Sequence, residues 1–195
     1  MTRAAVFLDR DGTLIDELGF LASAGGLRLL AGAAEGVRLL NQAGLAVVVV
    51  TNQSGIARGL FGEADLAAVH ARLRDELARS GARLDAILHC PHHPDFGAPE
   101  QRACACRKPE PGLLLEAARR LELDLPSSWT VGDSARDLEA GRRAGLAGLI
   151  LVATGKGAAE WRQLGEPLRS AVQRAPDLPA AARLILAQRV SPQGR

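Results

Sequence analysis

One unit recurs along this chain and constrains its fold more than any other feature. In each copy, apolar residues at helical spacing end at a glycine, and a short apolar run follows directly. The copies are Gly44 with residues 45–50, Gly81 with residues 84–88, and Gly145 with residues 146–152. Residues 4–8 and 129–131 read as further strands. Strands that alternate with helices form a parallel sheet with helices on both faces, so we expect an α/β fold. The fully apolar runs at residues 47–50 and 149–152 should be its central strands.

Length and composition bound the organisation of the chain. It has 195 residues, of which 47% are apolar, and this is enough for one buried core. We expect a single domain over residues 1–190, with an irregular loop at residues 90–106. We expect residues 191–195 to form a disordered tail.

Charge and composition also exclude several classes of partner. The 24 basic residues nearly balance the 22 acidic ones, and four Phe, two Trp and no Tyr offer few stacking platforms. We therefore expect no nucleic-acid partner. The first apolar run, residues 4–8, is too short for a signal-peptide core, and the longest, residues 144–153, falls well below the ~20 residues of a membrane span. We therefore expect a cytoplasmic protein without a membrane partner. Because no heptad repeat or long apolar stripe is evident, we expect a monomer.

Polar segments follow three of the predicted strands at the point where each strand ends. Residues 9–13 read DRDGT, residues 51–55 read TNQSG, and residues 132–133 read GD. Each segment alone is an ordinary turn or helix-capping sequence. However, the carboxyl ends of parallel strands meet at one edge of the sheet, where ligands collect. Carboxylates beside a hydroxyl group and glycines at this edge indicate a site for magnesium and a phosphoryl group.

Together with Lys108, these segments resemble the four signature motifs of the haloacid dehalogenase (HAD) phosphatases. The resemblance covers nearly the whole chain and implies a Rossmann-like core with a minimal cap. It implies that Asp9 is the nucleophile and forms an aspartyl-phosphate, with Asp11 as general acid and base. Thr51 and Lys108 would hold the phosphoryl oxygens. Magnesium would lie on Asp9, the backbone carbonyl of Asp11, and Asp133.

A second cluster offers ligands for a different metal. Cys90, His92, Cys104 and Cys106 lie in one loop that is rich in Pro and Gly. Three thiolates and an imidazole fill the four positions of a closed zinc site, which would pin the loop and take no part in catalysis. The alternative is three free cysteines, which their close clustering disfavours.

The spacing of this loop resembles that of two HAD branches, the heptose-bisphosphate and the histidinol-phosphate phosphatases. In both, the histidine that matches His92, and not His93, is a zinc ligand. Eleven residues separate His92 from Cys104, and CRKP follows at residues 106–109, which favours the heptose-bisphosphate branch. The resemblance implies a small phosphorylated sugar as substrate and removal of its C7 phosphate in ADP- or GDP-heptose biosynthesis. It leaves the preferred anomer open, and histidinol phosphate or another small metabolite is the alternative.

Substrate recognition would fall to loops, because the chain leaves no room for a large cap domain. By resemblance, the substrate-binding residues are Glu17, Leu18, Gly19, Phe20, Asn52, Gln53, Ser54 and Arg107. The second phosphate of the substrate needs cations, and the guanidinium fork of Arg107 suits it. Relatives often carry a lysine directly after Gly-Asp, where this chain has Ser134. We expect Arg136 to compensate.

Other interpretations of the chain are less well supported by its residues. A nucleic-acid 3′-phosphatase would share the core, but the balanced charge disfavours it. A zinc-stabilised binding module with an inactive site would not need all five motif residues. Of the remaining histidines, we expect His70 to be a surface residue, and His89 to support the zinc loop without binding metal.

Overall fold

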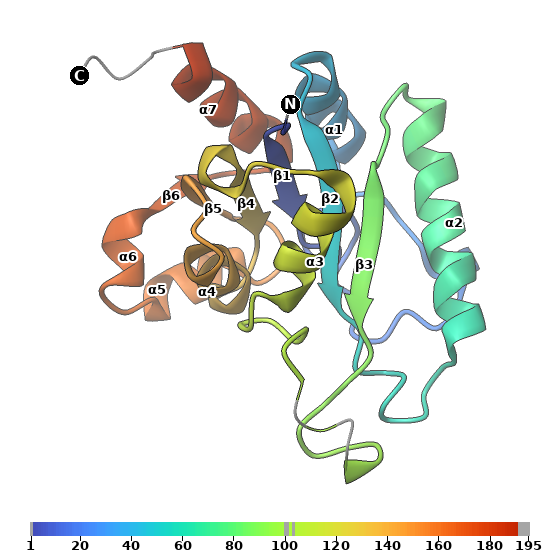
Figure 1. Ribbon diagram of the computed structural model, residues 1–195. Coiled ribbons are helices and arrows are strands. Elements are labelled where there is room, and N and C mark those ends of the chain that lie inside the picture. The colour runs from blue at the N-terminus through green and yellow to red at the C-terminus, as the bar shows by residue number, and fades with distance from the viewer. Residues whose placement is uncertain (1, 100–101, 103, 191–195) are drawn as a thin grey trace.

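The computed structural model describes residues 2–99, 102 and 104–190, and a six-stranded sheet forms its centre (Figure 1). Neighbouring strands are parallel and follow the order β3-β2-β1-β4-β5-β6. The strands are β1 (Ala5–Leu8), β2 (Ala46–Asn52), β3 (Ala86–Cys90), β4 (Trp129–Gly132), β5 (Gly148–Val152) and β6 (Val172–Ala175). The α/β prediction is confirmed, and the expected central strands β2 and β5 each have a neighbour on both sides.

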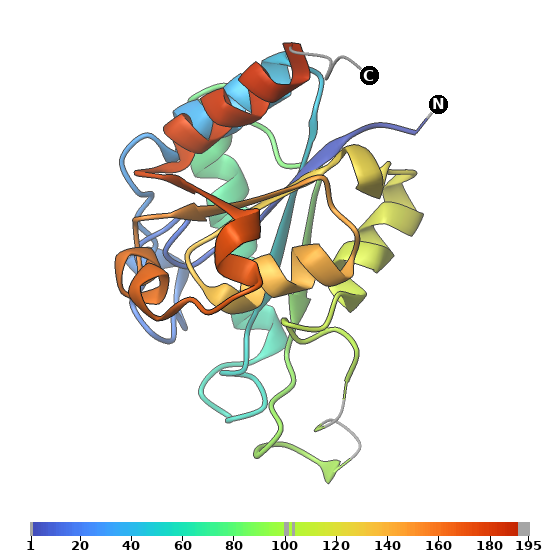
Figure 2. The same cartoon turned by 90° about the vertical axis from the view of Figure 1, so that its left-hand side faces the viewer.

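Helices cover both faces of the sheet (Figure 2). One face carries α1 (Ala33–Gln42), α2 (Glu63–Arg79) and α7 (Leu178–Val190), and the other carries α3 (Gly112–Leu121) and α4 (Ala135–Arg143). The shorter helices are α5 (Gly157–Gln163), α6 (Leu168–Ala171) and the 3-10 turns η1 (Ala24–Gly26) and η3 (Leu125–Ser127). Alternate residues of β2 divide between the two cores: Val47 and Val49 face α1 and α2, while Val48 and Val50 face α3.

Two differences from the sequence-based strands affect the site. β2 runs to Asn52 and β3 to Cys90, each two residues beyond its apolar run, so that Thr51 and Cys90 lie within strands. β6 was not predicted. Only two of its four residues are buried, because it is an edge strand, and a short edge strand lacks the apolar run that marks the central ones.

The topology places the functional loops at one edge of the sheet. The chain moves outward from β1 to β3 on one side and returns to β4 on the other, so the strand order reverses between β1 and β4. In Figure 1, β1, β2 and β3 point down, towards the segment that directly follows β3. The predicted tail at residues 191–195 lies outside the described residues, and within them no helix is long and apolar enough to cross a membrane.

Candidate active site

The carboxyl ends of β1, β2 and β4 bring the predicted motif residues together. Asp9 directly follows β1, and its backbone N–H donates to the carbonyl oxygen of Val131 in β4 (3.0 Å). Asp133 directly follows β4, and Thr51 is near the end of β2. All three side chains are almost fully buried. The point at which the strand order reverses therefore holds them, as expected for ligand sites in open α/β sheets.

Lys108, which follows the irregular loop in the sequence, contacts residues at two of these strand ends. Its Nζ donates to Asp9 Oδ1 (2.8 Å) and to the Val50 carbonyl (2.6 Å), and lies 2.7 Å from Asp137 Oδ1. Although burial alone would lower the pKa of Lys108, the charges of Asp137 and Asp9 raise it above its ordinary value. Its backbone exchanges two hydrogen bonds with the Asn52 amide (3.0 and 3.1 Å). The ammonium group is thus charged and fixed beside Asp9.

Three carboxylates gather at this point, and two of them, Asp9 and Asp137, contact the ammonium group. Oxygens of Asp9, Asp133 and Asp137 lie within 4.8 Å of one another. Burial and the charge of Asp9 raise the pKa of Asp133 to about 7, and burial raises that of Asp137 to about 6. Buried carboxylates in excess over cations favour a bound divalent ion, and oxygen donors are the ligands that magnesium prefers. Asp137 was not among the predicted ligands, and its second oxygen accepts from the Ser134 backbone N–H (3.1 Å).

Two glycines bring the backbone against Asp133. Gly12 has φ +78° and Gly155 has φ +55°, and a Cβ added at either position would overlap the Asp133 carboxylate. The hydroxyl of Thr154 donates to the Gly12 carbonyl (2.6 Å), and the N–H of Lys156 donates to Asp133 Oδ2 (2.8 Å). The segment at residues 153–156 therefore forms part of the site. Sequence reasoning missed it, although it follows β5 at the same sheet edge, and the rule applied to the other strands would have found it.

Asp11 is held by two side chains that only donate to it. Arg10 Nε and Nη2 donate to its two carboxylate oxygens (3.2 and 3.0 Å), and Gln53 Nε2 donates to Oδ2 (2.9 Å). Gln53 Nε2 also lies 2.8 Å from the hydroxyl oxygen of Thr51. Burial raises the pKa of Asp11 above its ordinary value, while the neighbouring Arg10 opposes this shift.

A pocket of about 320 Å³ opens above these residues, smaller than many drug-sized sites and suited to a compact polar ligand. Of the predicted catalytic and substrate-binding residues, those that line it are Asp9, Asp11, Glu17, Gly19, Phe20, Thr51, Asn52, Gln53, Ser54, Arg107, Lys108 and Arg136. Leu18 does not line the pocket, and 56% of its surface is exposed. Arg58, His93 and Lys156 also line it and were not predicted to do so.

Cations surround the mouth of this pocket. Arg58 stacks on the ring of Phe96, 4.0 Å from its centroid, and its Nη2 lies 2.9 Å from His93 Nε2. Lys156 pairs with Glu17 (3.2 Å). Arg136 lines the pocket from α4, and its buried Nε has no hydrogen-bond partner among the described residues. The mouth thus offers positive charge to an anionic ligand in addition to that of Lys108.

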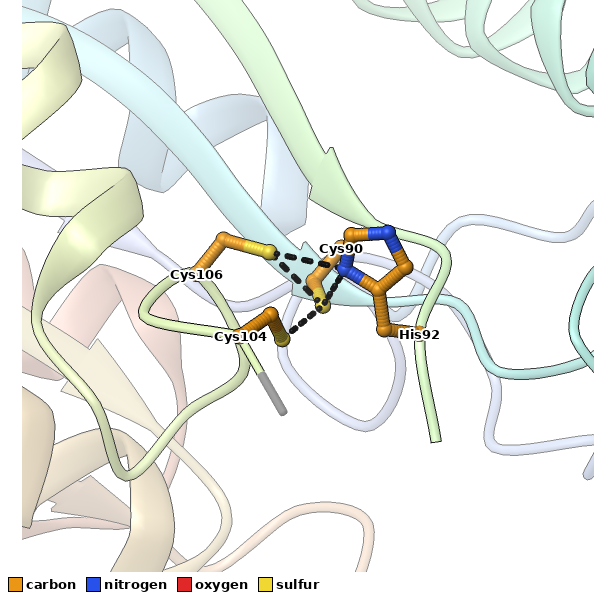
Figure 3. A group of neighbouring side chains, drawn as sticks. All are labelled: Cys90, His92, Cys104 and Cys106. Carbon is orange, nitrogen blue, oxygen red and sulfur yellow. Dashed lines mark hydrogen bonds between the residues drawn. The ribbon is translucent and has the colours of Figure 1, made fainter. Parts of the chain in front are cut away.

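The second predicted metal cluster forms at the end of β3 (Figure 3). The Sγ of Cys90 lies 3.1 Å from that of Cys106 and 3.6 Å from that of Cys104, and the Nδ1 of His92 lies 3.3 Å from the Cys106 Sγ. In tetrahedral zinc–thiolate sites, sulfur atoms lie about 3.8 Å apart, so little movement would be needed to hold zinc. Burial and the bond with Cys106 raise the pKa of the Cys90 thiol, which a metal would offset.

The other three histidines lie outside the cluster of possible zinc ligands. His93 turns to Arg58 and does not join the cysteines. The prediction that His70 is a surface residue is wrong: it is half-buried, and its Nε2 lies 3.2 Å from Arg10 Nη1. His89 does not reach the zinc cluster, because its Nε2 lies 3.0 Å from a carboxylate oxygen of Glu63 on α2.

Comparisons with known proteins agree with this geometry. A family model described as HAD-hydrolase-like matches residues 105–181. The chain is 41% identical to the D-glycero-beta-D-manno-heptose-1,7-bisphosphate 7-phosphatase of Pseudomonas aeruginosa, over 95% of this chain and 99% of the relative. It is 44% identical to the protein of the same name from Rhodopseudomonas palustris, over 75% and 82% of the two chains.

Solved structures of similar proteins share the whole fold. The D,D-heptose 1,7-bisphosphate phosphatase of B. bronchiseptica, complexed with magnesium and phosphate, is similar with a TM-score of 0.85 at 40% identity, over 95% of this chain and 99% of that one. The D,D-heptose 1,7-bisphosphate phosphatase of Burkholderia thailandensis has a TM-score of 0.71 at 34% identity, over 95% and 99%.

Proposed function

The chain belongs to the heptose 1,7-bisphosphate 7-phosphatase family of HAD-like hydrolases, and on that premise we propose that it removes the C7 phosphate of D-glycero-D-manno-heptose 1,7-bisphosphate. One observation carries the proposal: Asp9 lies beside the buried Lys108 at the floor of a pocket whose mouth is cationic. The floor suits the phosphoryl group that reacts, and the mouth suits a second phosphate on the same substrate.

The residues support a two-step hydrolysis. The Asp9 carboxylate attacks phosphorus, the bond to the sugar oxygen breaks, and an aspartyl-phosphate forms on the protein. Asp11 protonates the departing sugar oxygen, and in the second step takes a proton from the water that releases phosphate. Thr51 and Lys108 hold the phosphoryl oxygens by a hydrogen bond and a charge-assisted hydrogen bond.

Two metals complete the proposal. Asp9, Asp133 and the backbone carbonyl of Asp11 would hold magnesium, which when bound offsets the charge that the carboxylates share with phosphate. Support comes from the crowding of the buried carboxylates and from the B. bronchiseptica structure, which is complexed with magnesium and phosphate. Zinc at Cys90 and its partners would be structural, because four protein ligands leave no open position.

We propose that residues 1–190 act as a single domain, as a cytoplasmic monomer without a nucleic-acid partner. The balanced charge of the chain supports the last of these points. The preferred anomer decides whether the product serves ADP- or GDP-heptose synthesis, and both anomers belong in the test.

The function is tested by phosphate release with magnesium from each anomer of heptose 1,7-bisphosphate, beside histidinol phosphate. We expect the heptose bisphosphate to be the better substrate, because its second phosphate can pair with the cations at the mouth of the pocket. Histidinol phosphate has one phosphate, and the rest of the molecule carries no negative charge. Preference for histidinol phosphate would move the enzyme to the other branch. If neither compound is hydrolysed, only the assignment to the HAD superfamily would stand.

Arg136→Ala should raise KM for heptose bisphosphate about tenfold, because it removes a charge-assisted contact with the second phosphate. Arg136 lines the pocket, and its Nε has no partner among the described residues. The KM for p-nitrophenyl phosphate, which has one phosphate, should stay the same. Arg142→Ala is the matched control, since Arg142 lies on the same helix but pairs with the exposed Glu139. An equal change on both substrates would count against this role.

A further inference from the structure

A buried arginine connects Asp11 to a helix that contributes no residue to the proposed chemistry. Arg10 is only 1% exposed, and each nitrogen of its guanidinium group has a partner. Nε and Nη2 face the Asp11 carboxylate, Nη2 also donates to Gln53 Oε1 (2.9 Å), and Nη1 lies 3.2 Å from His70 Nε2. The guanidinium group is thus fixed on three sides.

His70 meets Arg10 as a neutral acceptor. Burial, followed by the charge of Arg10, lowers the pKa of His70 to about 3, so the ring carries no charge near neutral pH. All guanidinium N–H groups are donors, hence the unprotonated nitrogen that faces Arg10 must be Nε2. Helix α2 fixes the backbone of His70, because its apolar residues Val69 and Leu73 are buried in the core.

We propose that Arg10 and His70 are positioning residues, which fix the plane of the Asp11 carboxylate towards the leaving oxygen of the substrate. This inference rests on the proposed role of Asp11 as general acid. The terminal torsion of an aspartate is soft, so a carboxylate needs external contacts to hold one orientation. The fork of a guanidinium group supplies two parallel N–H donors that define a plane. His70 and Gln53 in turn stop the guanidinium group from rotating.

If Arg10 and His70 position Asp11, the effect of their loss on activity depends on the leaving group of the substrate. If they only stabilise the fold, it does not. A sugar alkoxide leaves only with a proton, so cleavage of an alkyl phosphate depends on an aligned acid. The p-nitrophenolate ion is stable without a proton, so its departure does not depend on one. Since kcat/KM covers only the steps up to departure of the leaving group, the comparison isolates the acid step from the later hydrolysis.

The test compares His70→Leu with wild type on these two substrates. The leucine leaves Arg10 Nη1 without its acceptor, and we expect kcat/KM for heptose bisphosphate to fall about tenfold. For p-nitrophenyl phosphate we expect a change of less than about twofold. His70→Gln should restore most of the loss, because its amide oxygen can accept in place of Nε2. His89→Leu is the matched control: the His89 ring packs edge-on against His70, and its Nε2 faces Glu63.

Equal losses on both substrates, no loss on either, or a His70→Gln variant as impaired as His70→Leu would overturn the proposal. Arg10→Lys keeps the buried charge but not the fork, and must show the same substrate-dependent loss. If circular dichroism shows that His70→Leu is poorly folded, the comparison is made with Arg10→Lys in its place. Asp11→Asn separates the acid role of Asp11 from the positioning role of Arg10 and His70. If this variant loses no more activity on the sugar substrate than on p-nitrophenyl phosphate, Asp11 is not the general acid. If Asp11→Asn shows the larger loss on the sugar substrate and His70→Leu does not, only the positioning role is wrong.

Discussion

Asp9→Asn should lower phosphate release from heptose bisphosphate by a factor on the order of 10⁴ or more, the largest effect expected in this protein. The amide nitrogen and neutral oxygen of asparagine cannot form the aspartyl-phosphate. The side chains have nearly the same shape, and the backbone bond from residue 9 to Val131 does not depend on the side chain. Loss of activity should therefore occur in a folded protein, with Lys108 still paired with Asp137.

Trapping the intermediate gives an independent measurement. With radiolabelled substrate and rapid acid quenching, the wild-type chain should retain label in an acid-stable phosphoprotein, and Asp9→Asn should retain none. Asp75→Asn, an exposed carboxylate on α2, is the matched control and should behave as wild type. Substantial turnover by Asp9→Asn would mean that another group attacks phosphorus.

Cys106→Ala should abolish zinc binding and give the largest loss of stability among the expected effects. If free zinc exceeds its dissociation constant a thousandfold, the metal contributes about 4 kcal/mol to the free energy of unfolding. For a chain of this size, that loss lowers the melting temperature by roughly 8–16 °C. Zinc content by mass spectrometry and thermal unfolding with and without a chelator would measure both quantities.

The control is the adjacent histidine. His93 is next to the ligand His92 in the sequence but lies outside the cluster. The His93→Ala variant should therefore keep one zinc ion per chain. The zinc-free variant should also bind substrate less well, because Arg107 Nη1 donates to the His92 carbonyl (3.0 Å) and lines the pocket. A Cys106→Ala protein that melts with the wild type and retains zinc would show that the cysteines do not hold the metal.

The sequence could predict those parts of the site that depend on local order. Asp9 and Asp133 directly follow apolar strands, and parallel strands must bring their ends together whatever the loops do. The zinc ligands were equally accessible, because all four lie close together in the sequence, between positions 90 and 106. The segment at residues 153–156 could also be predicted, because it directly follows the apolar strand β5.

Contacts between distant segments were not accessible in this way. His70 is sixty residues from Arg10, and only the packing angle of α2 on the sheet decides whether they meet. A histidine between buried helix positions looks like a surface residue until that angle is known. Leu18 was assigned by resemblance alone, and the turn that brings Gly19 and Phe20 to the pocket leaves it outside.

The two glycines against Asp133 have a consequence for how this scaffold can diversify. Because Gly12 and Gly155 bring main chain against the carboxylate, a side chain at either position would overlap it, and neither position tolerates substitution. The rim is built differently, from long side chains such as Arg58 and Phe20 on separate loops. New substrate preferences can therefore arise through changes at the rim, while steric constraint keeps the main chain against the Asp133 carboxylate unchanged.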